Sequence, residues 1–167
     1  MKHLHSYWRM EYIQAPKKPE ESENPFAHLP QNPDDSAVHI IHRGKSIYIV
    51  LNKFPYNPGH LLVVPYREVS RPVDLTKVER SELMENLIFG QTVLEEAFNP
   101  DGFNIGFNIG SAGGAGIPKH LHAHIVPRWE GDTNFMPVLG ETRVLPESMD
   151  RMWKKLHATA SRIKEVS

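Results

Sequence analysis

Apolar residues are concentrated in five short stretches of the chain, where they alternate with polar residues or form a short continuous run, and one longer stretch repeats its apolar residues at three- and four-residue steps. Alternation with a period of two is typical of a β-strand with one buried face, whereas steps of three and four are typical of an amphipathic helix. The expected helix covers residues 75–98, between the third and fourth strands. The five expected strands cover residues 38–43, 46–52, 60–65, 103–110 and 120–126.

Turn and capping residues mark the ends of these elements. The run Arg-Gly-Lys-Ser at 43–46 predicts a hairpin between the first two strands, and Asn-Pro-Asp-Gly at 99–102 ends the helix. Thr76 and Glu79 have the spacing of a capping box at the start of that helix. A second amphipathic helix is expected over 145–166. The pattern therefore predicts an α+β fold with an antiparallel sheet, one long helix and a C-terminal helix.

Length and charge narrow the class of protein. A chain of 167 residues is the size of one domain and can bury a core. The net charge of −1 gives no broad basic field, so nucleic acid is not an expected partner. No apolar run approaches the ~18 residues of a membrane span, and the first residues contain no apolar signal core. The absence of cysteine excludes a disulfide framework. We therefore expect a cytoplasmic enzyme that does not contact a membrane.

Three histidines occupy alternate positions of the fifth expected strand. Because side chains alternate across a strand, His120, His122 and His124 should share one face. A glycine-rich run at 110–116 comes just before them, and such a backbone can turn several N–H groups toward an anion. Imidazoles beside an anion-binding loop predict chemistry on phosphate.

The residues alone leave three interpretations of this stretch open. The histidines could form a polar, solvent-facing side of the strand. They could bind zinc, with His60 as a fourth ligand because the chain has no cysteine. One of them could be a nucleophile that attacks phosphorus with help from its neighbours. We favour the third interpretation, because three in-register histidines after a glycine-rich approach are unusual for a plain solvated face.

Two motifs resemble those of a known family. Residues 120–126, His-Leu-His-Ala-His-Ile-Val, resemble the His-x-His-x-His-x-x signature of the histidine triad (HIT) nucleotide hydrolases and transferases. Residues 58–65, which include His60, resemble the upstream strand that carries a fourth histidine in the same superfamily. Residues 127–135 resemble the sequence after the triad in the branch that contains diadenosine tetraphosphate (Ap4A) phosphorylases and related hydrolases. The resemblance implies the HIT fold with a five-stranded sheet, and a homodimer formed through the long helix and a sheet edge.

The resemblance also implies a division of the chain. Residues 37–136 would be the HIT domain, residues 1–36 an N-terminal arm that packs on the core, and residues 137–167 a C-terminal extension with the amphipathic helix. In this scheme the aromatic-rich run at 7–13 contributes packing alone.

The family match assigns roles to the histidines. His122 would be the nucleophile and would form a nucleotidyl-histidine intermediate. His60, His120 and His124 would position it and bond phosphate oxygens or the leaving group. Asn52 matches a ribose-binding residue and Asn108 a polar residue that lines the site. The expected phosphate-binding amides belong to Gly113, Gly114, Ala115 and Gly116.

Strand alternation adds an apolar part to the site. Val50 shares a face with Asn52, and Leu62 shares a face with His60. If these faces coincide, the two strands form a pocket that is half apolar and half polar, which suits a nucleoside.

One departure from the family pattern bears on the acceptor. Gly116 stands where phosphorylase-like members tend to have serine, which weakens the case for inorganic phosphate as acceptor. Lys119 could supply a charge, but a solvated role at the strand edge is favoured.

The leading interpretation is therefore a hydrolase or nucleotidyltransferase that cleaves the α-phosphate linkage of dinucleoside polyphosphates or adenosine phosphoesters. The alternatives are an Ap4A phosphorylase and a nucleotide-binding sensor without turnover. The expected partner is an adenine nucleotide. No cofactor and no tightly bound zinc is expected, and magnesium only as a complex with the polyphosphate.

Overall fold

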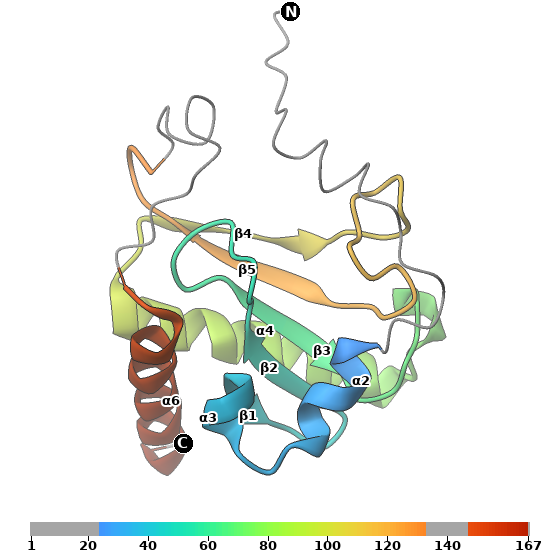
Figure 1. The fold of residues 1–167 in the computed structure, drawn as a ribbon, viewed down its shortest axis with the longest axis horizontal. Helices are drawn as coiled ribbons and strands as arrows, with labels where there is room; N and C mark the ends of the chain where they lie inside the picture. Colours follow the sequence, from blue (N-terminus) through green and yellow to red (C-terminus); the bar gives the residue numbers. More distant parts are fainter. Residues whose placement is uncertain (1–23, 133–146, 167) are drawn as a thin grey trace, which may run out of the picture.

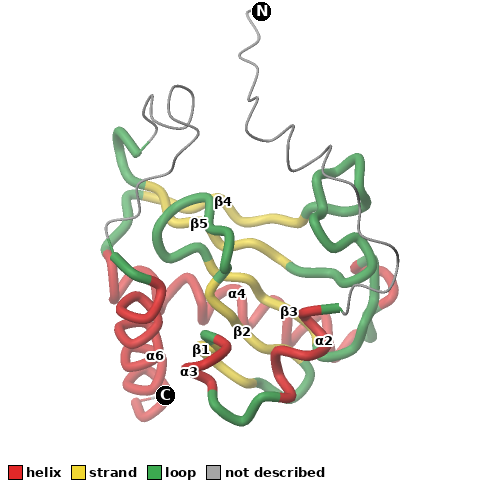
Figure 2. Tube along the Cα trace, in the orientation of Figure 1, coloured by secondary structure: helices red, strands yellow, loops and turns green. Residues whose placement is uncertain are grey.

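The computed structural model describes residues 24–132 and 147–166, which form an antiparallel sheet with helices on both faces (Figures 1 and 2). The sheet order is β1-β2-β3-β5-β4, so the last strand lies between β3 and β4. The expected antiparallel sheet of five strands is confirmed. The strands are β1 (Ile40–Arg43), β2 (Ile47–Leu51), β3 (Leu61–Pro65), β4 (Gly102–Phe107) and β5 (Ala123–Arg128).

Helix α4 (Lys77–Phe98) is the expected long helix and covers one face of the sheet (Figure 1). Its start is the predicted capping box, in which Thr76 Oγ1 accepts from the Glu79 N–H and the Glu79 carboxylate accepts from the Thr76 N–H. The helix approaches β5 closely at Gly90, which has no side chain. A Cβ atom at this position would lie only 2.7 Å from Cδ1 of Ile125. This layer holds the larger core cluster.

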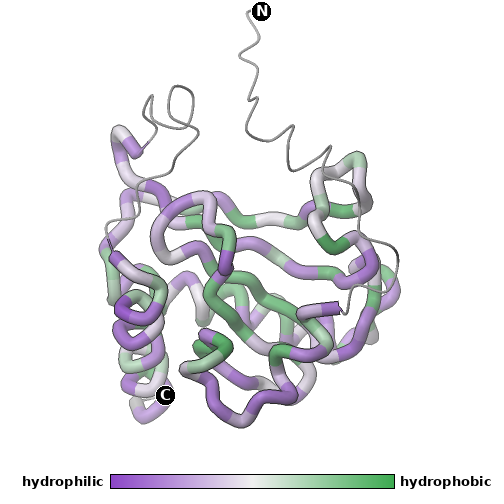
Figure 3. The backbone as a smooth tube through the Cα atoms, in the orientation of Figure 1, coloured by the Kyte–Doolittle hydropathy of each residue, from purple (hydrophilic) through white to green (hydrophobic). Residues whose placement is uncertain are grey.

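The C-terminal helix α6 (Met149–Val166) packs beside α4 and against β1. It begins later than the expected residue 145, and residues 133–146 lie outside the described part. Trp153 donates from its indole nitrogen to the Ile40 carbonyl at 2.8 Å, which ties the helix to the sheet. Hydrophilic and hydrophobic segments alternate along its turns (Figure 3). Its buried hydrophobic residues are Met152, Leu156 and Ala160.

The opposite face of the sheet is covered by short helices from residues 25–38, most of which belong to the predicted N-terminal arm. These are α2 (Pro25–His28), η1 (Leu29–Gln31) and α3 (Asp35–Val38); a further short helix, η2 (Pro72–Asp74), precedes α4. Phe26 of α2 is buried, and Tyr48 of β2 donates its hydroxyl to the Phe26 carbonyl at 2.8 Å. The second core cluster on this face contains Phe26, Ile40, Tyr48, Val50, Leu62 and Val64.

Residues 1–23, which include the aromatic-rich run at 7–13, lie outside the described part, so the division into arm, domain and extension remains a prediction. No helix of the described residues is both long enough and apolar enough to cross a bilayer.

The prediction that all three triad histidines lie within one regular strand is wrong. β5 begins at Ala123, where its pairing with Val63 and Phe107 begins, so His120 and His122 come before the strand. The chain there follows a turn, because the His120 N–H donates to the carbonyl of Ile117. The three rings nevertheless gather on one side of the sheet.

Candidate active site

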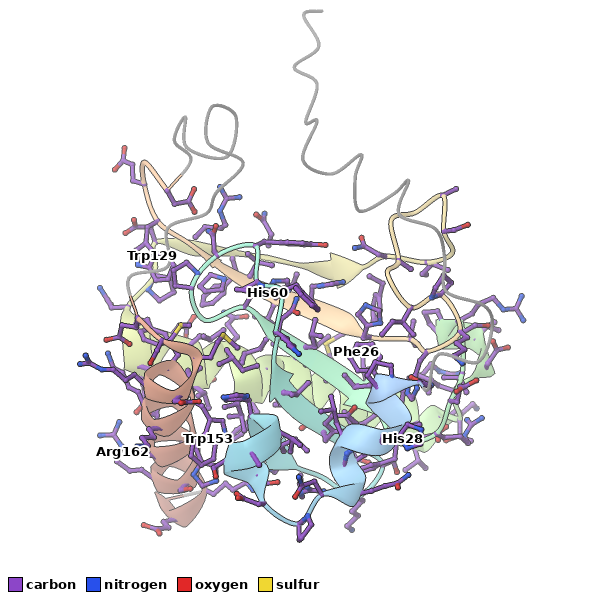
Figure 4. All side chains as sticks on the ribbon, viewed as in Figure 1. Phe26, His28, His60, Trp129, Trp153 and Arg162 are labelled. Atoms are coloured by element: carbon purple, nitrogen blue, oxygen red, sulfur yellow. The ribbon has the colours of Figure 1, made fainter. Side chains whose placement is uncertain are left out.

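His60, which is labelled in Figure 4, forms a hydrogen-bonded pair with His124 at the centre of the sheet. Nδ1 of His60 lies 3.0 Å from the backbone N–H of Tyr56, which can only donate, so Nδ1 accepts and Nε2 carries the proton. Nε2 of His60 lies 2.9 Å from Nδ1 of His124 and donates to it. Neutral His124 therefore carries its own proton on Nε2.

His122 has the opposite arrangement. Its Nδ1 lies 2.8 Å from the backbone carbonyl of His120, and a carbonyl oxygen can only accept. The proton of neutral His122 is therefore on Nδ1, and Nε2 is unprotonated. The His122 ring lies between the rings of Phe26 and His124, at centroid distances of 4.8 and 5.0 Å. This is the tautomer that a nucleophilic histidine requires.

His120 uses both ring nitrogens within the protein. Its Nε2 lies 2.8 Å from the Pro65 carbonyl and donates to it. Its Nδ1 lies 2.8 Å from the side-chain nitrogen of Asn24, which donates in return. The residue is 1% exposed. Both ring nitrogens of His120 are therefore engaged within the protein, and its role toward substrate remains a prediction.

Burial keeps these histidines neutral. It lowers the pKa of His120 and of His122 below the ordinary value of 6.5, and it lowers the pKa of His124 to about 4. Repulsion from the neighbouring imidazole acts in the same direction on His122 and His124. His122 therefore has an unprotonated ring nitrogen at neutral pH without any separate base.

This burial predicts that acid destabilises the fold. Because the pKa of His124 is about 4 in the folded state and 6.5 when unfolded, the unfolded chain binds more protons below pH 6.5. The free energy of unfolding should fall as the pH drops from 7 to 4, by about 3 kcal/mol from His124 alone. Urea titrations at each pH measure it. The His124→Gln protein should show a shallower fall, whereas exposed His28→Gln should match the wild type; equal slopes in all three would contradict this account.

The two amide side chains expected to bind substrate both lie at the histidine pair. Oδ1 of Asn52 accepts from the Phe54 N–H at 2.9 Å, and its Nδ2 lies 3.3 Å from Nδ1 of His60. Asn52 therefore caps the start of the β2–β3 loop as well as contacting His60. Nδ2 of Asn108 lies 3.4 Å from Nε2 of His124. With the ring proton on Nε2, both of these atoms are donors, so both N–H groups can be offered to an acceptor.

The apolar residues expected to line the nucleoside pocket are more enclosed than the sequence suggested. Val50 and Leu62 do face each other across β2 and β3, as predicted. Their exposed fractions are only 3% and 5%, because Phe26 and its neighbours pack over them. Leu29 and Ile117 are partly buried at the edge of this cluster and offer the accessible apolar surface there.

The glycine-rich loop is a closed turn in which two of the four expected amides already have partners. The N–H of Gly114 donates to the Ser111 carbonyl at 3.0 Å, and the N–H of Ala115 donates to the Gly110 carbonyl at 3.2 Å. Positive φ angles at Gly110 and Gly114 allow this turn. Within 113–116, the first and last amides are therefore the better candidates for an anion.

Tyr56 was missed by the sequence analysis because it lies in a turn-rich loop without a motif. Its ring stacks on His124 with a centroid distance of 5.7 Å and an interplanar angle of 13°. Its centroid also lies 4.7 Å from that of His60, and its hydroxyl lies 3.5 Å from the amide nitrogen of Asn108. Tyr56 therefore covers the histidine pair on the side where Nε2 of His124 is presented.

A polar cluster fastens the Tyr56 loop to the end of β5. Asn57 donates to the Asp132 carboxylate at 2.7 Å and to the Pro127 carbonyl at 3.0 Å. Arg128 makes a bidentate ion pair with the same carboxylate, and these bonds hold the pKa of Asp132 well below its usual range. Within the run 127–135, Arg128 and Asp132 therefore hold the Tyr56 loop in place. Residues 133–135 lie outside the described part.

The family model of the HIT domain matches residues 34–131, which is more than half of the chain and includes all four histidines. This protein belongs to the HIT family.

Among the described residues, no group of three or more histidine, aspartate or glutamate side chains is arranged to hold a metal ion. Asn24 and Phe26, which contact the triad, come before the matched region.

Individual relatives extend the comparison beyond the HIT domain. A Mycobacterium tuberculosis protein named AP-4-A phosphorylase is 41% identical over 165 residues, covering 95% of this chain and 84% of that one. An asymmetrical bis(5'-nucleosyl)-tetraphosphatase of Schizosaccharomyces pombe is 38% identical over 93 residues, covering 56% of this chain and 50% of that one.

Solved structures support the HIT fold. A hypothetical histidine triad nucleotide-binding protein from Sulfolobus tokodaii superposes with a TM-score of 0.69 at 21% identity, covering 84% of this chain and 94% of that one. A zinc-bound histidine triad family protein from Mycobacterium smegmatis gives 0.67 at 20% identity, with 85% and 95% covered.

Proposed function

We propose that this HIT-family protein transfers an adenylyl group from a dinucleoside polyphosphate, such as Ap4A, to His122 and then to an acceptor. The observation that carries the proposal is the pair of complementary tautomers: His122 presents an unprotonated Nε2, and neighbouring His124 presents a protonated one. A nucleophile and a hydrogen-bond donor for the leaving group therefore lie side by side, with ring centroids 5.0 Å apart.

The first step forms one bond and breaks one. Nε2 of His122 attacks the α-phosphorus, and the bond between that phosphorus and the bridging oxygen breaks as the polyphosphate departs in line. Nε2–H of His124 donates a hydrogen bond to the bridging oxygen as negative charge develops on it. A departing ATP is a stable anion, so complete proton transfer is not required.

The second step resolves the nucleotidyl-histidine. The acceptor oxygen forms a bond to the same phosphorus while the bond between that phosphorus and Nε2 of His122 breaks. The electron pair of the broken bond returns to Nε2, and the proton of the acceptor passes to solvent water. In this scheme Asn52 contacts the ribose and Asn108 a phosphate oxygen, while the base lies at the Leu29 and Ile117 edge of the apolar cluster.

Inorganic phosphate is the proposed acceptor, supported by the likeness to AP-4-A phosphorylase over 95% of this chain. Phosphorolysis of Ap4A yields ATP and ADP, whereas hydrolysis yields ATP and AMP. Incubation with Ap4A, with and without phosphate, followed by chromatography of the nucleotides separates the two. Products that are AMP and ATP in both incubations would make water the acceptor. Tight binding without any product would favour the nucleotide sensor.

The homodimer implied by the family resemblance is also part of the proposal. β4 is an edge strand, and its residue Ile105 is 45% exposed. Ile105 lies opposite Ile125, whose side chain packs under α4, so both side chains lie on the face of the sheet that α4 covers. On α4, Met84 and Ile88 lie one turn apart and are 55% and 54% exposed. An exposed edge beside an apolar stripe fits a second copy of the chain. The cytoplasmic location stays a prediction.

We therefore expect light scattering after size exclusion to give the mass of two chains. Ile88→Glu should shift the protein to the mass of one chain, because a carboxylate would be desolvated in the interface. Val78→Glu is the matched control, since Val78 is 72% exposed on the same helix but outside the stripe, and it should leave the mass unchanged. A wild-type protein with the mass of one chain would contradict the dimer.

A further inference from the structure

Asn24 is a buried polar residue whose side-chain amide is fully used. Its Oδ1 accepts from the Phe26 N–H at 3.1 Å, and its Nδ2 donates both to the Glu68 carboxylate and, at 2.8 Å, to Nδ1 of His120. The residue is 6% exposed. A backbone N–H can only donate and a carboxylate can only accept, so these two partners fix which end of the amide faces His120.

The fixed amide selects one tautomer of His120. Since Nδ2 of Asn24 is a donor, Nδ1 of His120 must be unprotonated, and the ring proton lies on Nε2, where the Pro65 carbonyl accepts it. Both ends of the ring are thereby held. The backbone carbonyl of the same residue accepts the Nδ1 proton of His122. A continuous chain of contacts thus runs from Glu68 through Asn24 and His120 to His122.

The same short segment supports His122 through an apolar contact. Asn24 is the N-cap of α2, and that helix places the Phe26 ring against His120 and His122, at centroid distances of 5.6 and 4.8 Å. Figure 4 shows Phe26 on the side of α2 that faces the sheet. Loss of the cap would also loosen this ring.

We propose that Asn24, oriented by Glu68, is a positioning residue that fixes the tautomer and orientation of His120 and, through the His120 carbonyl, aims Nε2 of His122. The segment before the matched HIT domain thus completes the active site. The inference rests on the proposed function only in taking His122 as the nucleophile.

A neutral donor at position 24 matters because of the charges around His120. Glu68 favours its protonated form, whereas Lys119 disfavours it, and an imidazolium here would in turn act on His122. A carboxylate at position 24 would leave both nitrogens of His120 facing acceptors and would favour the imidazolium. An amide avoids this, because it supplies the hydrogen that Nδ1 needs without a negative charge.

The decisive variant is Asn24→Asp, which keeps the size of the side chain and the cap on α2 but replaces the donor with an acceptor. We expect kcat for Ap4A to fall about 10–100-fold while KM changes less than about threefold, because the variant loses the orientation of His122 and keeps the contacts that bind the substrate. The kcat of the variant should also depend on pH over a range in which the kcat of the wild type is constant, because His120 can bind a second proton in the variant. Asn32→Asp is the matched control: Asn32 caps the Asp34 N–H in an exposed turn, and kcat should be unchanged.

A second readout does not depend on turnover. Long-range ¹H–¹⁵N correlation spectra of the resting full-length protein report the tautomer of each imidazole. The wild type should show His120 protonated on Nε2 alone, and Asn24→Asp should show protonation of both nitrogens. Wild-type His120 protonated on Nδ1 would overturn the proposal even if the variant failed to fold. An unchanged His120 tautomer and unchanged kcat in a folded Asn24→Asp protein would overturn it as well.

Because the spectra need no substrate, they test the positioning of His120 independently of whether the proposed function is correct. If Ap4A is not a substrate but the tautomer changes as expected, the positioning of His120 holds and only the reaction assignment fails. Glu68→Gln retains an acceptor for Asn24, so it should preserve the wild-type tautomer; a switch to the other tautomer would show that Asn24 is not oriented in this way.

Discussion

Replacement of His122 by alanine or asparagine is expected to abolish Ap4A turnover while nucleotide affinity stays within about threefold of the wild type. Covalent catalysis loses its whole pathway with its nucleophile, and no neighbouring ring can substitute for it. The Nε2 proton of His124 occupies the nitrogen that would have to attack, and both nitrogens of His120 are bonded within the protein. Affinity is spread over the base, ribose and phosphate contacts, so most of it should remain.

The test combines steady-state rates, equilibrium binding and mass spectrometry of protein quenched without acid. Wild-type protein should carry an adenylyl adduct on His122, and the His122→Ala protein should carry none. His28→Ala is the matched control, because His28 is exposed and lies outside the histidine cluster, so its turnover should equal that of the wild type. Wild-type turnover by the His122→Ala protein, or an adduct on another residue, would refute the assignment.

The elements of the fold could be predicted because the local pattern of apolar residues follows burial. Residues 61–65 are all buried in β3, with alternate side chains in the α4 and α2 layers, and the sequence there is apolar throughout. The capping box of α4 was predictable because Thr76 and Glu79 are only three residues apart. Local patterns of this kind need no knowledge of the rest of the chain.

The start of β5 could not be predicted, because the alternation of histidines begins at His120, before the point where strand pairing begins. Pairing begins at Ala123 for reasons that lie in β3 and β4. The amides of the glycine-rich loop posed a similar problem. Glycine composition shows that such a loop can turn, but not that the N–H groups of Gly114 and Ala115 point to the loop's own carbonyls.

The tautomers that carry the chemistry depend on contacts between distant residues. Asn24 meets His120 across 96 positions, and His60 meets His124 across 64. The family signature identified the histidines by residue type and spacing. It did not indicate which nitrogen of each ring holds the proton, since backbone groups of Tyr56 and Pro65 decide that.

Replacement of His124 by alanine should slow the reaction by an amount that depends on the leaving group. His124 supplies a hydrogen bond to the bridging oxygen, and help of this kind typically contributes about 10²–10⁴-fold. The benefit is largest where the departing oxygen is most basic. With phenyl esters of AMP that carry different ring substituents, we therefore expect a loss near the lower figure for the most acidic phenol and near the upper figure for the least acidic.

The diagnostic quantity is the slope of log(kcat/KM) against the pKa of the leaving phenol. The slope should be steeper for His124→Ala than for the wild type, because the variant leaves the developing charge without a donor. Asn108 is a suitable comparison, since its amide lies 3.4 Å from Nε2 of His124 but cannot supply the ring proton. Asn108→Ala should lower all rates by a similar factor and leave the slope unchanged. Parallel lines for wild type and His124→Ala would remove His124 from the leaving-group side and confine it to positioning.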